Sequence, residues 1–272
     1  MPDTDAGLAQ EAIEIRDRIA DVVREAGRLA LPKFRTSFKS WTKDKSSPVT
    51  EVDIAVNDLL RERLTAVAPD YAWLSEETID DAARLSSRRV WIVDPIDGTR
   101  GFIAGLPDWT IVVALVEDGR PIAAVVFAPA TDAMFTAALG AGTLLNGTPI
   151  ATSGGGTIDG ARVAGPKGTL ARAAGLDGRM EVVPKIHSLA LRLARVAEGS
   201  LDAAFASADS NDWDLAAADL LVHEAGGVLT SFEGQKLRYN RADTAHGALV
   251  AAGRERHARL VELIRGSRVE RA

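Results

Sequence analysis

The stretch WIVDPIDGT, residues 91–99, is the part of this sequence that says most about its fold and chemistry. Its apolar start predicts a strand buried on both faces, and this strand ends at two aspartates, Asp94 and Asp97. Two ionised carboxylates at a buried strand end repel each other, so either one is protonated or a cation lies between them. Gly98 allows close approach of the backbone to a ligand, and with Thr99 it could begin a turn whose N–H groups face an anion. We therefore expect a site that pairs a cation with an anion.

The type of cation follows from the available ligands. The sequence has no cysteine, which removes thiolate ligands, thiolate nucleophiles and disulfides. Oxygen ligands favour a hard cation, and Mg²⁺ is the usual partner of phosphate. A calcium-binding EF-hand loop is excluded, because the twelfth position counted from Asp94 is Gly105 and not a glutamate. A haloacid-dehalogenase-type phosphatase is disfavoured, because it needs aspartates two apart, whereas Asp94 and Asp97 are three apart.

Further carboxylates stand at the expected ends of helices and strands. Asp53 follows Thr50, which we expect to cap a helix. Glu76 and Glu77 are adjacent at the end of a short predicted strand, and Asp214 begins a later helix. Acids are common in first helical turns because of the helix dipole, and adjacent glutamates are usually solvated. Each of these residues alone is therefore a weak indication of a site.

Composition excludes several classes of function. The 272 residues are 46% hydrophobic and 26% charged, which is typical of a globular protein. The net charge of −6 argues against a binding surface for nucleic acid polymers. The N-terminus is acidic without an apolar signal core, and no apolar run approaches the roughly 20 residues of a membrane span. We expect a cytoplasmic protein that does not enter a membrane.

Periodicity and turn signals predict an α+β or mixed α/β fold. Apolar positions at helical spacing predict helices over 8–30, from Thr50 to Pro69, and over 187–198, 213–225 and 254–265. Strands are expected over 71–77, 89–94 and 201–206, with a meander over 110–150. The glycine-rich segment 153–160 divides the chain into halves 1–152 and 153–272. We expect the two halves to form one compact catalytic unit, in which the second half contributes Asp214 and the substrate loops.

Five segments together resemble the inositol monophosphatase family. They are KSSPVTEVD (45–53), LSEE (74–77), WIVDPIDGTRGF (91–102), GAGTLLNGTPI (140–150) and DWDLAAADLLVHEAGG (212–227). This resemblance implies a layered αβαβα sandwich, usually a homodimer, and a Mg²⁺-dependent, lithium-sensitive phosphatase. The implied reaction is hydrolysis of small phosphate monoesters by metal-activated water.

The resemblance also implies a role for each matching residue. Two or three Mg²⁺ ions are expected, with the first ion held by Glu76, Asp94 and the carbonyl of Ile96, and the second by Asp94, Asp97 and Asp214. Thr99, with Glu76 and Asp53 nearby, would orient the attacking water. The amides of Gly98 and Thr99 would bind the phosphate, and Glu77 would support the ligands from behind.

The segments expected to contact the rest of the substrate depart from the family pattern. Where members often carry Gly-Ser-Ala, this chain has Lys185, Ile186 and His187 before Ser188. We predict that His187 and Ser188 bind substrate, where a basic pair could meet a second phosphate or a carboxylate. The alternative is a surface loop in which Ser188 only caps a helix. Inositol-specific members place a glutamate where this chain has Ser207, a position that Asp209 or Asp212 could fill.

The sequence leaves the substrate open. Inositol-type monophosphates rank first, closely followed by 3'-phosphoadenosine 5'-phosphate, because SPVTEVD and the step 100–102 also resemble bisphosphate nucleotidases. Histidinol phosphate ranks third, on the likeness of GTRGFIAGLPDWT to the histidinol-phosphatase branch. A different class, a catalytically silent metal- and phosphate-binding module, would be marked by loss of Thr99, Glu76 or Asp214, and all three are present.

Overall fold

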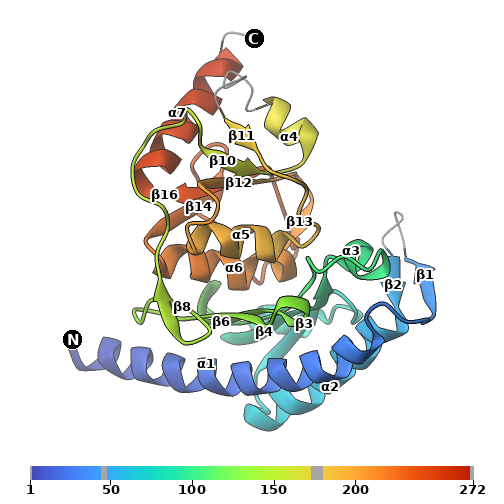
Figure 1. Cartoon of the computed structure of the whole chain (residues 1–272). Helices are drawn as coiled ribbons and strands as arrows, with labels where there is room; N and C mark the ends of the chain where they lie inside the picture. The colour runs from blue at the N-terminus through green and yellow to red at the C-terminus, as the bar shows by residue number, and fades with distance from the viewer. Residues whose placement is uncertain (1, 44–47, 173–179, 270–272) are drawn as a thin grey trace.

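The computed structural model describes residues 2–43, 48–172 and 180–269, so residues 45–47 of the first family-like segment lie outside it. The described chain forms five layers in the order helices, sheet, helices, sheet, helix (Figure 1). The mixed α/β fold and the αβαβα layering predicted from the sequence are confirmed. Within the described residues, no helix combines the length and apolar character needed to cross a membrane.

The first two layers are a helix pair and a seven-stranded sheet. Helices α1 (Pro2–Ala30) and α2 (Glu51–Val67) pack on the outer face of this sheet. Its strands, in spatial order, are β3 (Ala72–Ser75), β4 (Arg89–Asp97), β5 (Thr110–Glu117), β6 (Arg120–Ala128), β7 (Ala133–Ala138), β8 (Thr143–Leu145) and β9 (Thr148–Ile150). In this sheet β3 and β4 run parallel, whereas β4 and β5 run antiparallel. Strands β5 to β9 form the predicted antiparallel meander.

The middle layer consists of α5 (Leu189–Ala197) and α6 (Asp212–Glu224), which lie between the two sheets (Figure 1). The second sheet has the order β11 (Glu181–Val182), β10 (Arg162–Ala164), β12 (Ala203–Ala206), β16 (Leu249–Gly253) and β14 (Gly227–Ser231). Helix α7 (Arg254–Val269) covers its outer face. The two sheets fall on either side of residue 152, while one buried cluster joins them through α5 and α6. The division of the chain at this residue stays a prediction.

The remaining elements are short. The pairs β1 (Ser40–Thr42) with β2 (Pro48–Thr50) and β13 (Ser210–Asn211) with β15 (Ala245–His246) flank the two sheets. Among the described residues, the short helices are α3 (Thr99–Ile103), α4 (Lys167–Arg172) and 3-10 turns at Leu31–Lys33, Ala82–Ser86 and Pro129–Thr131. The sequence does not predict helix α4 or the turn at Ala82–Ser86, because segments this short cannot show a helical periodicity.

Two local features position the site. Thr50 accepts hydrogen bonds from the amides of Val52 and Asp53 at the start of α2, which confirms the predicted cap. In β4, the pairing with β5 shifts register between Asp94 and Asp97, so that three steps on β4 match two on β5. Such a bulge redirects side chains at the end of a strand. Here it lies between the two aspartates that the sequence singles out.

Candidate active site

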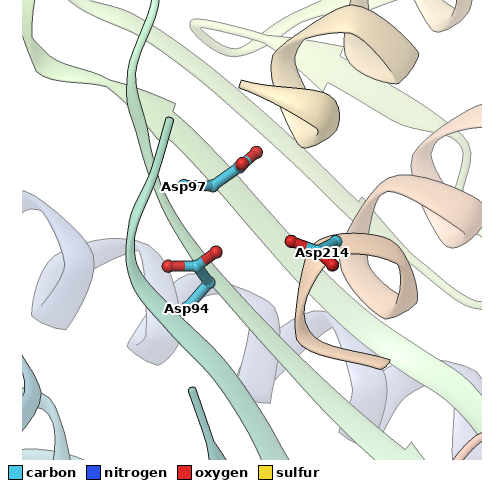
Figure 2. Close-up of side chains that lie close together, drawn as sticks. All are labelled: Asp94, Asp97 and Asp214. Atoms are coloured by element: carbon cyan, nitrogen blue, oxygen red, sulfur yellow. The ribbon is translucent and has the colours of Figure 1, made fainter. Parts of the chain in front are cut away.

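Three aspartates from both halves of the chain meet at the end of β4. Asp94 and Asp97 come from β4 and Asp214 from the first turn of α6. Each offers one carboxylate oxygen that lies within 4.8 Å of those of the other two. Figure 2 shows the three side chains gathered around one space. Asp94 and Asp97 are 1% and 6% exposed. Burial, followed by the neighbouring carboxylates, raises the pKa of Asp94 and of Asp214 well above the ordinary value.

Asp94 and Asp214 each accept a hydrogen bond from a backbone amide nearby in the chain. Asp94 Oδ1 accepts the amide of Ile96 at 3.0 Å, which holds the turn through Pro95. Asp214 Oδ2 accepts the amide of Asn211 at 2.6 Å, in a capping box at the start of α6. The carboxylates are therefore rigidly placed by backbone bonds that span two or three residues.

Asp97 is held by the start of a different helix. It accepts hydrogen bonds from Ser188 Oγ (2.7 Å) and from the amides of Leu189 (3.2 Å) and Ala190 (2.7 Å) at the beginning of α5. Burial raises the pKa of Asp97, and these donors act in the opposite direction by stabilising the charged form. The two halves of the chain are thus joined at the site itself.

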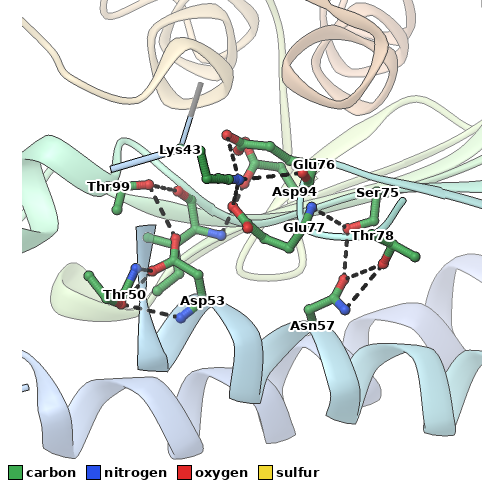
Figure 3. A network of polar contacts seen from close by, with 11 residues as sticks. Lys43, Thr50, Asp53, Asn57, Ser75, Glu76, Glu77, Thr78, Asp94 and Thr99 are labelled. Carbon is green, nitrogen blue, oxygen red and sulfur yellow. Dashed lines mark hydrogen bonds and ion pairs between the residues drawn. The ribbon is translucent and has the colours of Figure 1, made fainter. Parts of the chain in front are cut away.

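Asp53 and Thr99 form a second group beside the aspartates (Figure 3). Thr99 Oγ1 lies 3.2 Å from Asp53 Oδ1 and 2.9 Å from the carbonyl oxygen of Ile96. Asp53 Oδ2 also accepts the amide of Thr50 at 2.9 Å, together with the Thr50 hydroxyl. Burial raises the pKa of Asp53 to about 6, against the hydrogen bonds from Thr50. The arrangement fixes the Thr99 hydroxyl between two acceptors.

Glu76 and Glu77 share the ammonium group of Lys43 (Figure 3). Lys43 Nζ lies 3.6 Å from Glu76 Oε1 and also bonds a carboxylate oxygen of Glu77. Burial raises the pKa of Glu76 to about 7, although Lys43 lowers it. The side chain of Glu77 is 3% exposed, against 21% for Glu76. Its supporting role, like the ligand role of Glu76, stays a prediction.

Gly98 makes room for the loop that carries His187 and Ser188. Its φ of +90° is left-handed, and an added Cβ would lie 2.9 Å from the amide nitrogen of Ser188 and 3.0 Å from the carbonyl oxygen of Asp108. Only glycine meets both conditions without strain. The turn from Gly98 into α3 therefore packs directly against the start of α5.

These residues line a cavity of about 660 Å³. Its acidic floor contains Glu76, Asp94, Asp97 and Asp214, and its other lining side chains include Lys43, Arg100, Lys185, His187 and Asp209. All side-chain ligand atoms on the floor are carboxylate oxygens, the donor set of a hard divalent cation. A cation there would also remove the repulsion that raises the pKa of Asp94 and Asp214. The residues present therefore fit Mg²⁺.

The predicted substrate loop has a mixed outcome. His187 lines the cavity, whereas Ser188 is fully buried, caps α5 and bonds Asp97. Substrate contact by Ser188 stays a prediction that this burial does not favour, because its hydroxyl is occupied by protein groups. Of the two aspartates suggested as replacements near Ser207, Asp209 lines the cavity. Asp212 is 0% exposed and bonded to His246, so it cannot take that place.

Sequence reasoning missed three residues that support the site. Lys43 lies in a polar, lysine-rich stretch that the sequence predicts to be an exposed loop or hairpin. Asp108 bonds the backbone and ring of His187, and buried Arg192 donates to the carbonyls of Phe205 and Ile186 behind Asp97. Asp108 and His187 are 79 positions apart, so no local spacing indicates their contact.

Comparison with known proteins gives one consistent result. The model of the inositol monophosphatase family matches residues 10–268. Inositol monophosphatase 2 of Solanum lycopersicum is 34% identical over 236 residues, covering 82% of this chain and 89% of that one. Histidinol-phosphatase of Mycobacterium tuberculosis is 36% identical over 205 residues, covering 71% and 77%. The solved structure of a Thermotoga maritima IMPase has a TM-score of 0.81 and 27% identity, covering 92% of this chain and 96% of that one.

Proposed function

The chain belongs to the inositol monophosphatase family and is a phosphomonoesterase, and we propose that it hydrolyses inositol monophosphate-type esters with Mg²⁺. The observation that carries this proposal is the set of three aspartates that each offer one carboxylate oxygen within 4.8 Å of those of the other two. They lie on the floor of a cavity of about 660 Å³, large enough for a small phosphorylated alcohol.

The acidic floor would hold two or three Mg²⁺ ions. The ligands would be Glu76, Asp94 and the Ile96 carbonyl for one ion, and Asp94, Asp97 and Asp214 for another. When bound, Mg²⁺ supplies charge neutralisation at the phosphate and lowers the pKa of an attacking water. The bonds that α5 and α6 make to Asp97 and Asp214 hold these carboxylates in place without further rearrangement.

The remaining chemistry is assigned to Thr99, Asp53 and Glu76. The Thr99 hydroxyl, fixed between Asp53 Oδ1 and the Ile96 carbonyl, would orient the attacking water. The proton of this water would be taken up by Asp53, whose raised pKa suits a base near neutral pH, while Glu76 would help to orient the water. The amides of Gly98 and Thr99 would bind phosphate oxygens. Attack by water in line with the leaving oxygen requires no covalent enzyme intermediate.

Histidinol phosphate, which ranks third from the sequence alone, becomes the second candidate substrate, because the bisphosphate nucleotidase relative is less similar, at 28% identity. The relative named histidinol-phosphatase is 36% identical to this chain. Asp209 on the cavity wall offers a carboxylate to a substrate amine. Inositol phosphates have no such amine, so the ratio of the two activities distinguishes the candidates.

Inhibition by Li⁺ and a homodimer are proposed from the family, and a cytoplasmic location is proposed as well. Li⁺ titration of activity and light scattering of the purified protein would test the first two.

The decisive experiment measures phosphate release with and without Mg²⁺. The substrates are inositol 1-phosphate, histidinol phosphate, 3'-phosphoadenosine 5'-phosphate and fructose 1,6-bisphosphate. We expect release only with Mg²⁺, reversed by a chelator, and the largest kcat/KM for inositol 1-phosphate. Folded protein that binds Mg²⁺ but releases phosphate from none of the four would favour the silent binding module.

A further inference from the structure

The ring of His187 is held in one orientation by Asp108. Asp108 Oδ2 accepts the backbone amide of His187 at 2.5 Å and lies 2.8 Å from its Nδ1. The side chains are only 19% and 14% exposed, so the pair is largely shielded from solvent. Because an ionised carboxylate can only accept hydrogen bonds, Nδ1 carries the proton of the neutral ring.

The other ring nitrogen, Nε2, then keeps a free lone pair. In neutral histidine with a protonated Nδ1, Nε2 is a hydrogen-bond acceptor. Within the part of the chain that the structure describes, no protein group bonds this nitrogen, and His187 lines the cavity. The basic side chains of the same wall, Lys185 among them, can only donate. In its neutral form, His187 therefore gives this wall a hydrogen-bond acceptor.

The position of the His187 ring relative to the turn from Gly98 into α3 is also fixed. At Gly101 in α3, an added Cβ would lie 3.0 Å from His187 Cβ and 3.2 Å from Cγ. The next residue, Ser188, packs equally closely on Gly98. His187 thus lies against the turn whose amides are proposed to bind phosphate. From this position it would meet the alcohol part of a bound ester.

We propose that His187, oriented by Asp108, accepts a hydrogen bond from a hydroxyl of the substrate's alcohol part and selects polyol phosphates. This inference rests on the proposed phosphatase function and deepens it. The alternative is that the basic pair Lys185 and His187 meets a second phosphate or a carboxylate. Asp108 is a positioning residue, because it acts only through the ring that it holds.

The test compares two esters that differ only in their hydroxyls: inositol 1-phosphate and cyclohexyl phosphate, assayed at alkaline pH where a histidine ring is ordinarily neutral. For His187→Asn we expect kcat/KM to fall about 10- to 100-fold for inositol 1-phosphate, the scale of one lost hydrogen bond to a buried polar group. The value for cyclohexyl phosphate should change less than about threefold.

Further variants distinguish substrate binding by His187 from a purely structural role of this residue. Asparagine can still donate to Asp108 but lacks the Nε2 acceptor, so a purely structural role would be rescued by His187→Asn. Asp108→Ala should give the same selective loss, because the ring is released. His223→Ala, at an exposed histidine of α6, should leave both esters unaffected.

Three outcomes would overturn the inference. The first is an equal loss on both esters, and the second is wild-type selectivity in His187→Asn. The third is a loss confined to 3'-phosphoadenosine 5'-phosphate, which would show that His187 binds an anion. Calorimetric binding of both esters, with Ca²⁺ replacing Mg²⁺, measures the same selectivity without turnover. A wild type that binds inositol 1-phosphate selectively but hydrolyses nothing would refute the proposed function and leave this inference standing.

Discussion

Asp94 is a buried acid whose environment disfavours its charge. Desolvation raises its pKa most, and the carboxylates of Glu76, Asp97 and Asp214 add to the effect. In the metal-free chain this charge is a source of instability, whereas as a metal ligand it is required. One residue therefore has opposite effects on the stability of the free protein and on activity.

Asp94→Asn should separate these effects. We expect kcat/KM to fall by at least about 100-fold, the scale of losing one electrostatic group in the transition state. The melting temperature of the metal-free protein should not fall, because a neutral amide relieves the repulsion. The increase in melting temperature that Mg²⁺ causes in the wild type should largely disappear in this variant. Asp118→Asn, at an exposed turn, is the matched control. Near-wild-type turnover in a folded Asp94→Asn protein would exclude Asp94 as a ligand.

At the scale of elements, the site is built where several of them begin or end. The start of α5 holds Asp97, the start of α6 holds Asp214, and the cap of α2 holds Asp53. These donors are the amide groups that a helix leaves free in its first turn. The turn at Gly98, between β4 and α3, allows the end of β4 to pack closely against the start of α5.

Gly98→Ala should therefore disturb more than its own backbone. A left-handed φ costs alanine about 1 kcal/mol of folding free energy. At Gly98 an added Cβ would also push against Ser188 and the Asp108 carbonyl. Gly147→Ala is the matched control, because its φ is +81° and nothing lies within 4 Å of an added Cβ. Denaturant unfolding should show a clearly larger loss for Gly98→Ala, with activity reduced only in that variant. An equal loss of unfolding free energy in Gly98→Ala and Gly147→Ala would mean that the backbone at Ser188 can move to accommodate an added Cβ.

At the scale of the whole molecule, contacts between distant segments align the two halves. Buried Arg84, which follows the Glu76 segment, donates to Asn240 Oδ1 and to the carbonyl of Arg241. Within the second half, Arg256 of α7 donates to Ser153, Gly154 and Thr157, which ties the glycine-rich segment at the start of this half to α7. The site as a whole is acidic and shared between both halves.

This arrangement predicts how stability depends on pH and Mg²⁺. The folded pKa values of Asp53 and Glu76, about 6 and about 7, exceed their ordinary values. Between about pH 4.5 and pH 7 the native state then binds more protons than the unfolded state, so this contribution to the free energy of unfolding falls as pH rises. For Asp53 alone the loss at neutral pH is about 3 kcal/mol.

Denaturant unfolding of metal-free protein at pH 5.5 and pH 8 would measure this effect. Saturating Mg²⁺ should add little stability at pH 5.5 and much more at pH 8, because protons and metal compete for the same carboxylates. Asp53→Asn should reduce the pH dependence. A Mg²⁺ effect that is equal at both pH values would contradict the assignment of these groups to the site.

The sequence by itself determined the features that depend on short spacings. Apolar periodicity placed α2 and β4, Thr50 and Ser188 were recognisable as caps, and the Asp94–Asp97 step marked the site. These features follow from bonds and packing within one turn or one strand, so the local residues suffice.

Only the tertiary structure decided what meets across long distances in the chain. It bonded Ser188 to Asp97, Lys43 to Glu76 and Glu77, and Asp108 to His187. It also placed Asp209 at the cavity and turned Asp212 away toward His246. Such pairs depend on how sheets and helices stack and on where a bulge or a glycine turn redirects the chain. The energy of that packing is shared over the whole core, and no local pattern of residues records it.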